Sequence, residues 1–531
     1  MKEVRYLNLD KTAAYKKLCA LKRPANLKQH LHPAIIDDYS IPLGGGLTFN
    51  YAARSVDDEL LGLLSELAEE QQLTEKYQAL VSGAIMNTGE NRMVLHHLVR
   101  GQLGGDVTDN GKNLRGFYED ERSRVSEFAV KVHEGSLTGS TGKPFNTVVQ
   151  IGIGGSDLGP RALYRALKNF ARAAGIEKMR AEFISNVDPD DARAVLSSVD
   201  LESTLFIIVS KSGTTQETLT NRDFVMKAMA DARIRGLDPA RHFVAVTSET
   251  SPLSKSGDVL EAFFIDDNIG GRYSATSAVG GVVLSLAYGA RVFDELLQGA
   301  NEADRLAMEP NPGENSSMMD ALIGVYERNL LGIPCSAILP YSQALDRFPA
   351  HLQQLDMESN GKRVNRFGEP IDYASGPIIF GEPGTNGQHS FYQLLHQGTD
   401  TVTLQFAGFS KPQDPADLVT DGSTSQTKLN ANLAAQITAF ALGKHDANAN
   451  KSFPGNRTSS LIYGKRLTPR ALGALLAHYE NKVMFQGFLW NLNSFDQEGV
   501  ELGKLLAKQL LSGEGIDPVL GKYAALLGIP R

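Results

Sequence analysis

Short apolar runs alternate with helical patterns in the middle of this chain, and this alternation restricts the fold more than any other feature. The run Leu205–Val209 is apolar throughout, as expected of a strand buried on both faces of a parallel sheet. Strands that alternate with helices form a parallel sheet with helices on both faces. We therefore expect a doubly wound α/β sheet whose strands are Thr147–Ile151, Phe183–Ser185, Leu205–Val209, His242–Thr247 and Ala262–Ile265.

A second α/β stretch begins near residue 320. Its strand candidates are Ser336–Leu339, Ile378–Phe380 and Thr401–Gln405, with helical segments between and after them. The first hundred or so residues have a helical texture, because leucines recur at helical spacing in the charged segment 57–80. Residues 512–531 are expected to form a tail that packs on the body. The chain is thus predicted to hold two α/β units with helical additions.

Composition and charge exclude several classes of protein. The chain has 531 residues and a formal net charge of −8, and it carries no block of basic residues, so a nucleic-acid partner is not expected. Its two cysteines, Cys19 and Cys335, match no metal-site or disulfide spacing and favour a reducing compartment. The first residues lack the apolar run of a signal peptide. The charge-free stretch 273–290 contains Ser, Thr and Gly, which indicates a buried segment rather than a membrane span.

A glycine-rich segment, Gly152–Pro160, directly follows the first predicted strand and precedes a helical pattern. Ligands of open α/β sheets lie at the carboxyl ends of strands, and glycines let the backbone approach an anion there. A dinucleotide fingerprint needs glycine at the sixth place of G-x-G-x-x-G, where this chain has Asp157. A nicotinamide cofactor is therefore disfavoured. A tight strand–helix turn without a ligand remains an equal alternative for this segment alone.

A hydroxyl-rich segment, Ser210–Thr218, follows the buried strand Leu205–Val209. The spacing of Thr214 and Glu217 is that of a capping box, so a helix is expected to start here. Hydroxyls, backbone N–H groups and a helix N-terminus together form an anion site. The segment is not a Walker A loop, which favours a small phosphoester over a nucleoside triphosphate. The alternative is a polar capping turn.

Four further side chains are candidates for acid–base or charge-stabilising roles. Arg272 follows two glycines and could reach a developing negative charge, but taken alone it is more simply a surface arginine. Glu358 and Asp356 precede an Asn-Gly turn, and either is a possible general base or a solvated acid. His389 stands near a predicted helix start and could exchange protons, or be structural. Lys504 shares a predicted helix face with apolar residues, or simply pairs with a glutamate three residues earlier.

Several longer motifs occur together and in a fixed order. They are Asn87–Arg92 followed by His96, Gly-Arg-Tyr-Ser within Gly270–Gly280, Glu480-Asn-Lys, and the segment Phe488–Lys504. With these motifs the chain resembles the glucose-6-phosphate isomerase family over most of its length. The resemblance implies two sugar-isomerase-type (SIS) α/β domains with doubly wound parallel sheets and helical N-terminal and C-terminal additions. It implies a helical segment over 1–114, a small domain over 115–290, a large domain over 291–511 and a tail over 512–531.

The resemblance also implies a set of site residues. Glu358 would be the base, His389 and Lys504 the ring-opening pair, and Arg272 the group that steadies the enediolate. His389 would come from the neighbouring subunit of a homodimer. The residues that would bind substrate or its phosphate are Gly155, Ser156, Ser210, Lys211, Ser212, Gly213, Thr214, Thr215, Gln354 and Gln497.

The expected activity is a reversible aldose–ketose isomerisation of glucose 6-phosphate and fructose 6-phosphate through a cis-enediol, in glycolysis and gluconeogenesis. One carboxylate over one face of the enediol can take the proton from C2 and return it to C1, so no cofactor or metal is expected. The enzyme would be cytoplasmic, without a membrane partner. Three alternatives remain: an isomerase of mannose 6-phosphate or an amino sugar phosphate, a catalytically silent sugar-phosphate sensor, and a dehydrogenase.

Overall fold

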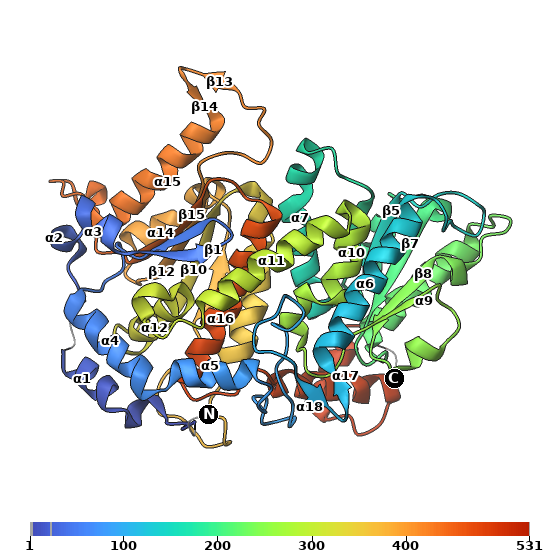
Figure 1. Ribbon diagram of the computed structural model, residues 1–531, viewed down its shortest axis with the longest axis horizontal. Helices are drawn as coiled ribbons and strands as arrows, with labels where there is room; N and C mark the ends of the chain where they lie inside the picture. The colour runs from blue at the N-terminus through green and yellow to red at the C-terminus, as the bar shows by residue number, and fades with distance from the viewer. Residues whose placement is uncertain (1–3, 22–23, 530–531) are drawn as a thin grey trace.

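The computed structural model describes residues 4–21 and 24–529, which form two β-sheets side by side with helices around them (Figure 1). One sheet has five strands in the order β6-β5-β7-β8-β9, and every neighbouring pair is parallel. All residues of β5, β7 and β8 are buried, which is why the sequence shows them as continuous apolar runs. The predicted doubly wound sheet is confirmed, with strands β5 (Thr147–Ile151), β6 (Arg180–Ile184), β7 (Thr204–Val209), β8 (Phe243–Thr247) and β9 (Ala262–Phe264).

The second sheet has six strands in the order β1-β2-β15-β12-β10-β11. The strands β10, β11 and β12 run parallel, as the sequence predicts for this half of the chain, and β15, a strand not predicted from the sequence, joins them parallel beside β12. The hairpin of β1 and β2 joins it antiparallel through β2 and β15. The strands are β1 (Ser40–Gly44), β2 (Leu47–Asn50), β10 (Cys335–Tyr341), β11 (Ile378–Gly381), β12 (Thr403–Phe409) and β15 (Ser459–Gly464).

The β1–β2 hairpin corrects the expectation that the first hundred residues are purely helical. Both strands are short, and β1 contains Pro42 beside the glycine run 44–46 that makes the turn. Proline and glycine are poor indicators of a strand. The side chains of Ile41 and Leu43 are nevertheless buried, and they fix β1 to the core. Tertiary packing thus decides the structure of this segment.

Helices cover both faces of the five-stranded sheet. Side chains of α8 and α9 share one apolar cluster with Val149 and Phe206, whereas α7 and α10 belong to the main core with Val148 and Leu205 on the opposite face. The longer helices are α4 (Asp58–Glu70), α6 (Leu114–His133), α7 (Leu158–Ala173), α9 (Gln216–Asp231), α10 (Ala278–Tyr288), α11 (Ala290–Leu306), α12 (Ser316–Asn329), α15 (Ser425–Leu442), α16 (Pro469–Leu489) and α17 (Glu501–Ser512). The shorter ones are α1 (Ala13–Leu21), α2 (Leu27–His30), α3 (Pro33–Asp38), α5 (Leu73–Val81), α8 (Pro189–Leu196), α13 (Phe348–Gln353), α14 (Tyr392–Gln397) and α18 (Pro518–Leu526).

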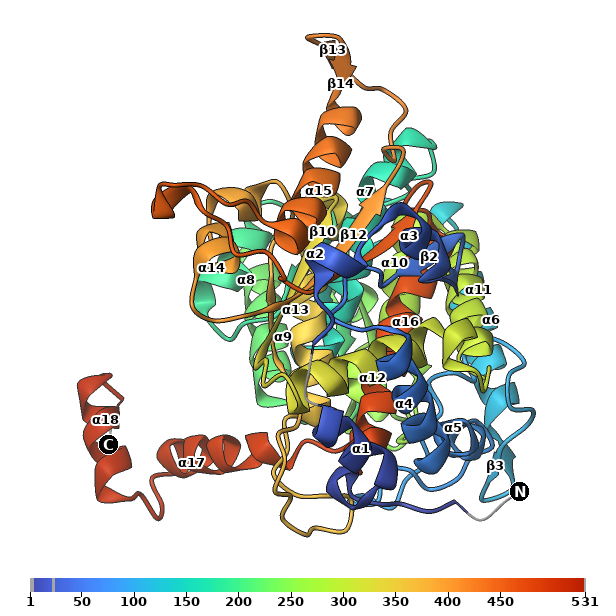
Figure 2. The same ribbon diagram turned by 90° about the vertical axis from the view of Figure 1, so that its left-hand side faces the viewer.

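Three peripheral features complete the fold. Two small hairpins, β3 (Thr108–Asp109) with β4 (Lys112–Asn113) and β13 (Val419–Thr420) with β14 (Ser423–Thr424), lie on the surface. The last two helices, α17 and α18, extend away from the body, which corrects the expectation of a tail packed on it (Figure 2). Of the helices described over 4–21 and 24–529, none is both long and apolar enough to cross a membrane.

Candidate active site

The glycine-rich segment lies where the strand order of the five-stranded sheet reverses, between β5 and β7. In open α/β sheets this crevice at the carboxyl ends of the strands is the usual ligand position. Gly154 has φ +62°, in the left-handed region that favours glycine. A Cβ on Gly155 would collide with the backbone of Gly271 and would lie 2.9 Å from Arg272 N. The glycines thus bring the loop after β5 into backbone contact with the segment that carries Arg272.

The hydroxyl-rich loop after β7 is stabilised by hydrogen bonds among its own residues. Ser210 Oγ lies 2.9 Å from Thr215 Oγ1 and accepts a hydrogen bond from Gly213 N at 3.1 Å. Thr214 N donates to Ser212 Oγ at 3.2 Å. The predicted helix start is confirmed, but the capping box is wrong: Thr215 precedes α9 as the N-cap residue, and its side chain makes no capping bond. The hydroxyls therefore gather at the N-terminus of α9, an arrangement suited to an anion.

Lys211, in the same loop, lines a cavity beside it. Its Nζ donates to Ile269 O at 3.2 Å and lies 3.7 Å from Asp267 Oδ1. Burial lowers the pKa of Lys211, and Asp267 opposes that shift. A cavity of about 200 Å³ is lined by Lys211 and by four other predicted site residues, Arg272, Gln354, Glu358 and Gln497. The structure thus brings five of the predicted residues to one space.

Arg272 is buried, so the expectation of a surface arginine is wrong, and each of its three guanidinium nitrogens donates a hydrogen bond. Its Nε donates to Ser359 Oγ at 2.6 Å, and its Nη2 donates to the carbonyls of Ser494 at 2.6 Å and Asp496 at 3.0 Å. Its Nη1 donates to Gln497 Oε1 at 3.2 Å. The same Nη1 lies 3.6 Å from Glu358 Oε1. Because its acceptors are fixed, the positive charge is aimed at the carboxylate without freedom to swing away.

Glu358 stands at the end of a π-helical turn, Gln354–Glu358, which continues α13. Such turns widen a helix locally and occur frequently at functional sites. The Glu358 side chain lines the cavity and is 21% exposed, so most of it is shielded from solvent. Gln354 reaches toward the glycine-rich loop, because a Cβ on Gly154 would lie 3.3 Å from its Nε2. The turn therefore presents two side chains to the crevice.

Asp356, in the same turn, is buried away from this space. Burial raises the pKa of Asp356 to about 7, Lys482 lowers it and Asp320 raises it further. Its Oδ1 has no hydrogen-bond partner among the described residues. A carboxyl group in this setting is kept neutral at mildly acidic pH, and it does not line the cavity that Glu358 lines.

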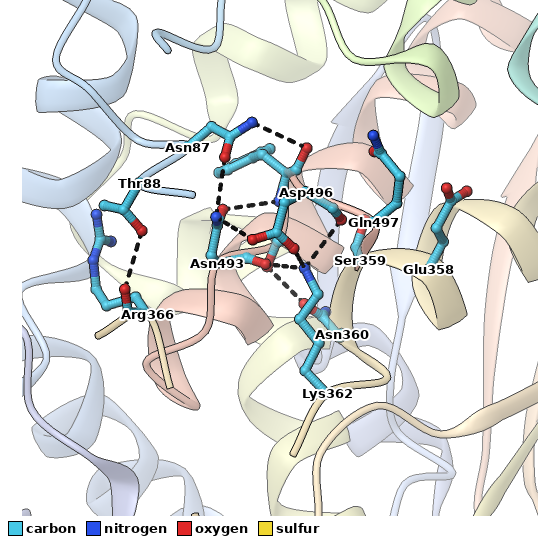
Figure 3. A network of polar contacts seen from close by, with 12 residues as sticks. Asn87, Thr88, Glu358, Ser359, Asn360, Lys362, Arg366, Asn493, Asp496 and Gln497 are labelled. Carbon is cyan, nitrogen blue, oxygen red and sulfur yellow. Dashed lines mark hydrogen bonds and ion pairs between the residues drawn. The ribbon is translucent and has the colours of Figure 1, made fainter. Parts of the chain in front are cut away.

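A polar network, drawn in Figure 3, holds the segment 493–497, whose Ser494 and Asp496 carbonyls accept hydrogen bonds from Arg272. Lys362 Nζ is ion-paired with Asp496 and donates to the Asp496 carbonyl at 3.1 Å. Asn493 Nδ2 donates to Asn87 Oδ1 at 3.0 Å, and Ser494 Oγ donates to Asn360 Oδ1 at 2.7 Å. No sequence pattern assigned a role to Lys362, and its one sequence signal is its place four residues after Glu358. Its partner, 134 positions away, could not be found from spacing.

The predicted ring-opening pair is not brought to this cavity within one chain. His389 is exposed at the end of the short helix Asn386–His389. Lys504 lies on α17, with its side chain 65% exposed and its Nζ 2.7 Å from Glu501 Oε1. Neither residue lines the cavity that holds Glu358. Within the ranges the structure describes, no group of three or more His, Cys, Asp or Glu side chains is placed to hold a metal ion.

Comparison with known proteins gives a consistent picture. The family model described as phosphoglucose isomerase matches residues 50–521. The glucose-6-phosphate isomerase of Treponema denticola is 61% identical over 492 residues, which cover 93% of this chain and 92% of that protein. The enzyme of the same name from Treponema pallidum strain Nichols is 58% identical over 529 residues, 98% of each chain. The crystal structure of a glucose-6-phosphate isomerase from Chlamydia trachomatis superposes with a TM-score of 0.92 at 42% identity, covering 98% of this chain and 100% of that one.

Proposed function

Because the chain belongs to the phosphoglucose isomerase family, it converts glucose 6-phosphate and fructose 6-phosphate into one another, and we propose that Glu358 is the base of that reaction. The reaction is an intramolecular transfer of hydrogen between C2 and C1 of the sugar, a step of glycolysis and gluconeogenesis. The observation that carries the proposal is the position of Glu358 Oε1, 3.6 Å from Arg272 Nη1 in a shared cavity.

The proposed steps use groups whose geometry is described above. Glu358 removes the C2 proton of the open-chain aldose, which yields a cis-enediol, and the same carboxyl group returns the proton to C1. Arg272 stabilises the negative charge that develops on the enediol oxygens, because its guanidinium is already oriented before the charge appears. A positioned base contributes roughly 10²–10⁴-fold to such a proton transfer.

The phosphate of the substrate is assigned to the loop Ser210–Thr215. Its hydroxyls, the N-terminus of α9 and Lys211 supply hydrogen bonds and positive charge to a dianion. The loop lies beside the cavity that Lys211 lines, so an anchored phosphate holds the sugar carbons against Glu358. Binding energy from this non-reacting end then serves orientation at the reacting end. Gly155 and Ser156 in the adjacent turn, together with Gln354 and Gln497, are assigned to contacts with the sugar.

A homodimer is proposed to complete the site with the partner's histidine. The C-terminal arm α17–α18 exposes large apolar side chains of one chain to solvent, and such surfaces mark interaction sites. The most exposed of them are Leu502, Leu511, Val519, Leu526 and Leu527. A second copy of the chain that covers this arm would also bring a histidine to each cavity from outside, which accounts for the exposure of His389 in one chain.

The domain division and the location are part of the same proposal. We assign the five-stranded sheet to a small domain over 115–290 and strands β10, β11, β12 and β15 to a large domain over 291–511. Residues 1–114 pack on the large domain and add β1 and β2 to its sheet, and 512–531 are the tail. A cytoplasmic location is supported by the metabolic role of the reaction and by the two free cysteines.

The reaction is tested by turnover of purified protein on fructose 6-phosphate in excess chelator, with a dehydrogenase that consumes glucose 6-phosphate as the reporter. Sustained turnover is expected, and turnover on mannose 6-phosphate alone would contradict the substrate assignment.

The shared site is tested by mixing two inactive variants, Glu358→Gln and His389→Ala, after dissociation and reassociation. In a mixed dimer one site combines an intact Glu358 with an intact histidine from the other chain, so about a quarter of wild-type activity should return. No recovery, although mixed dimers form, would show that His389 acts within its own chain.

A further inference from the structure

The six-stranded sheet has its own point where the strand order reverses. From β10 the chain crosses to β11 on one side, and from β12 it crosses to β15 on the other, so the reversal lies between β10 and β12. In open α/β sheets this crevice is a preferred ligand position. The corresponding crevice of the other sheet, between β5 and β7, contains the site described above. The reaction uses no residue of the second crevice.

A cavity of about 360 Å³ lies in this second crevice. It is lined by residues that directly follow the two strands, Ser342 and Gln343 after β10 and Lys411 and Gln413 after β12. A second cavity of about 300 Å³ adjoins it along α7, and the two share Asn169 and Gln343. Together they form a groove between α7 and the carboxyl end of the large sheet, and each volume lies in the range of small-molecule sites.

The groove offers uncommitted positive charge. Lys168 on α7 lines one cavity and Lys411 lines the other, and over 4–21 and 24–529 no ion pair or side-chain hydrogen bond engages either ammonium group. Two of the three acids that line the groove are ion-paired, Asp346 with Arg165 at 3.0 Å and Glu182 with Arg180 at 2.7 Å. The third, Asp414, accepts a hydrogen bond from the Ala416 amide at 2.9 Å and keeps its negative charge, so it offsets one of the two free lysines.

The groove also offers side chains that recognise hydroxyl groups. The amide of Asn169 and the hydroxyl of Ser342 make no hydrogen bond within the described part of the chain, and the amide nitrogen of Gln343 is likewise unengaged there. Gln413 is instead structural, because its Nε2 donates to Ala166 O at 2.8 Å and to Leu467 O at 3.0 Å, which ties α7 to the large sheet. Amides beside free ammonium groups suit a ligand with both hydroxyls and an anion.

We propose that this groove is a second binding site, separate from the catalytic cavity, for a hydroxylated phosphate monoester such as a sugar phosphate. Lys168 and Lys411 bind the phosphate, and Asn169, Ser342 and Gln343 bind the hydroxyls. The ligand lies against α7, the helix that begins directly after the glycine-rich turn of the catalytic cavity.

The test uses ribose 5-phosphate as the probe and hydrogen–deuterium exchange of the full chain as the readout. At probe concentrations up to about 10 mM, a range that detects dissociation constants of about 10 mM or lower, segments 165–173 and 410–418 should exchange more slowly. The protection should persist in Ser210→Ala/Thr215→Ala, which weakens only the catalytic phosphate loop. It should need at least tenfold more probe in Lys168→Glu/Lys411→Glu.

The matched control is Lys131→Glu/Lys255→Glu, which makes the same charge change at exposed positions outside the groove. This pair should shift the half-protecting concentration by less than twofold. The inference is wrong if protection is confined to 210–218, if both charge-reversal pairs act equally, or if 410–418 is never protected. It is also wrong about the hydroxyl contacts if inorganic phosphate protects the groove as well as ribose 5-phosphate does.

Isomerase activity separates this inference from the proposed function. Lys168→Glu/Lys411→Glu should retain the wild-type rate at saturating fructose 6-phosphate, because neither residue lines the catalytic cavity. An inactive wild-type protein would contradict the proposed function and leave the exchange result to be judged on its own.

Discussion

Glu358 and Arg272 differ from His389 and Lys504 in their position within one chain: the first two line a shared cavity, and the other two are exposed at the surface. In the first pair, Arg272 is 2% exposed and donates hydrogen bonds to four acceptors besides Glu358, whose side chain is 21% exposed and faces the cavity. The second pair is exposed, and Lys504 sits on an arm that leaves the body (Figure 2). Within one chain Glu358 and Arg272 line the same cavity, whereas His389 and Lys504 do not line it. Substitutions in the first pair should change the chemistry directly, whereas the role proposed for His389 depends on the proposed dimer.

The largest effect is expected from Glu358→Gln, which keeps the shape of the side chain and removes its basicity. The kcat for fructose 6-phosphate should fall on the order of 10³-fold with KM changed little, because the substrate is held elsewhere. The exposed Glu382→Gln is the control and should stay within twofold of wild type. Survival of most of the activity in Glu358→Gln would assign the base to another group.

A smaller but still large effect is expected from Arg272→Lys. The lysine keeps the charge but cannot satisfy the carbonyls of Ser494 and Asp496 together with Ser359 Oγ. We expect kcat to fall by roughly 10²-fold, with a lower melting temperature because buried acceptors lose their partners. Arg92→Lys, at the edge of the same cavity, should change kcat little. Equal losses in both variants would mean that total charge, rather than fixed orientation, matters.

The turn Gln354–Glu358 should also make the stability of the protein depend on pH, through Asp356. Burial raises the pKa of Asp356 to about 7, above its ordinary value, so this group favours the folded state at low pH and loses that contribution as pH rises toward 7. In Asp356→Asn the melting temperature should fall less than in wild type between about pH 4.5 and 7.5, as measured by calorimetry. An unchanged pH dependence would place the titration on another buried acid.

The smallest effect on stability is expected from Lys504→Ala. Its ion pair with Glu501 is exposed and spaced i,i+3, a contact worth about 0.2–0.5 kcal/mol, so the melting temperature should hardly move. Isomerisation of closed-ring substrate should nevertheless slow. Lys508→Ala, one turn further along α17, is the matched control. If the two variants lose activity equally, the arm matters only as a dimer contact and Lys504 has no role in ring opening.

Sequence patterns predict the elements of this molecule whose structure depends on neighbouring residues in the chain. The strands β5, β7 and β8 are apolar runs bounded by polar residues, and they lie within a residue of their predicted bounds. The loop at Ser210–Thr215 is a local cluster as well. The burial of Arg272 is different, because its partners Ser359 and Ser494 come from segments 87 and 222 positions away. Hydrogen-bond partners so far apart in the sequence cannot be predicted from the spacing of residues.

Two further features lie beyond sequence patterns for separate reasons. The π-turn Gln354–Glu358 shares its residue types with an ordinary α-helix, and its wider hydrogen-bonding is decided by what packs around it. His389 and Lys504 are exposed in one chain because of where the short helix Asn386–His389 and α17 lie in the fold. The residue identities could be predicted from the resemblance, but spacing does not indicate that neither residue lines the cavity of Glu358 within one chain.

The contact between Gly155 and Gly271 joins the loop after β5 to the segment that carries Arg272 through main chain alone. The spacing of these two segments is therefore fixed by backbone geometry, and exchanging side chains elsewhere does not adjust it. A wider or narrower crevice would require an insertion or deletion in one of the two segments, a rarer evolutionary event than a point substitution.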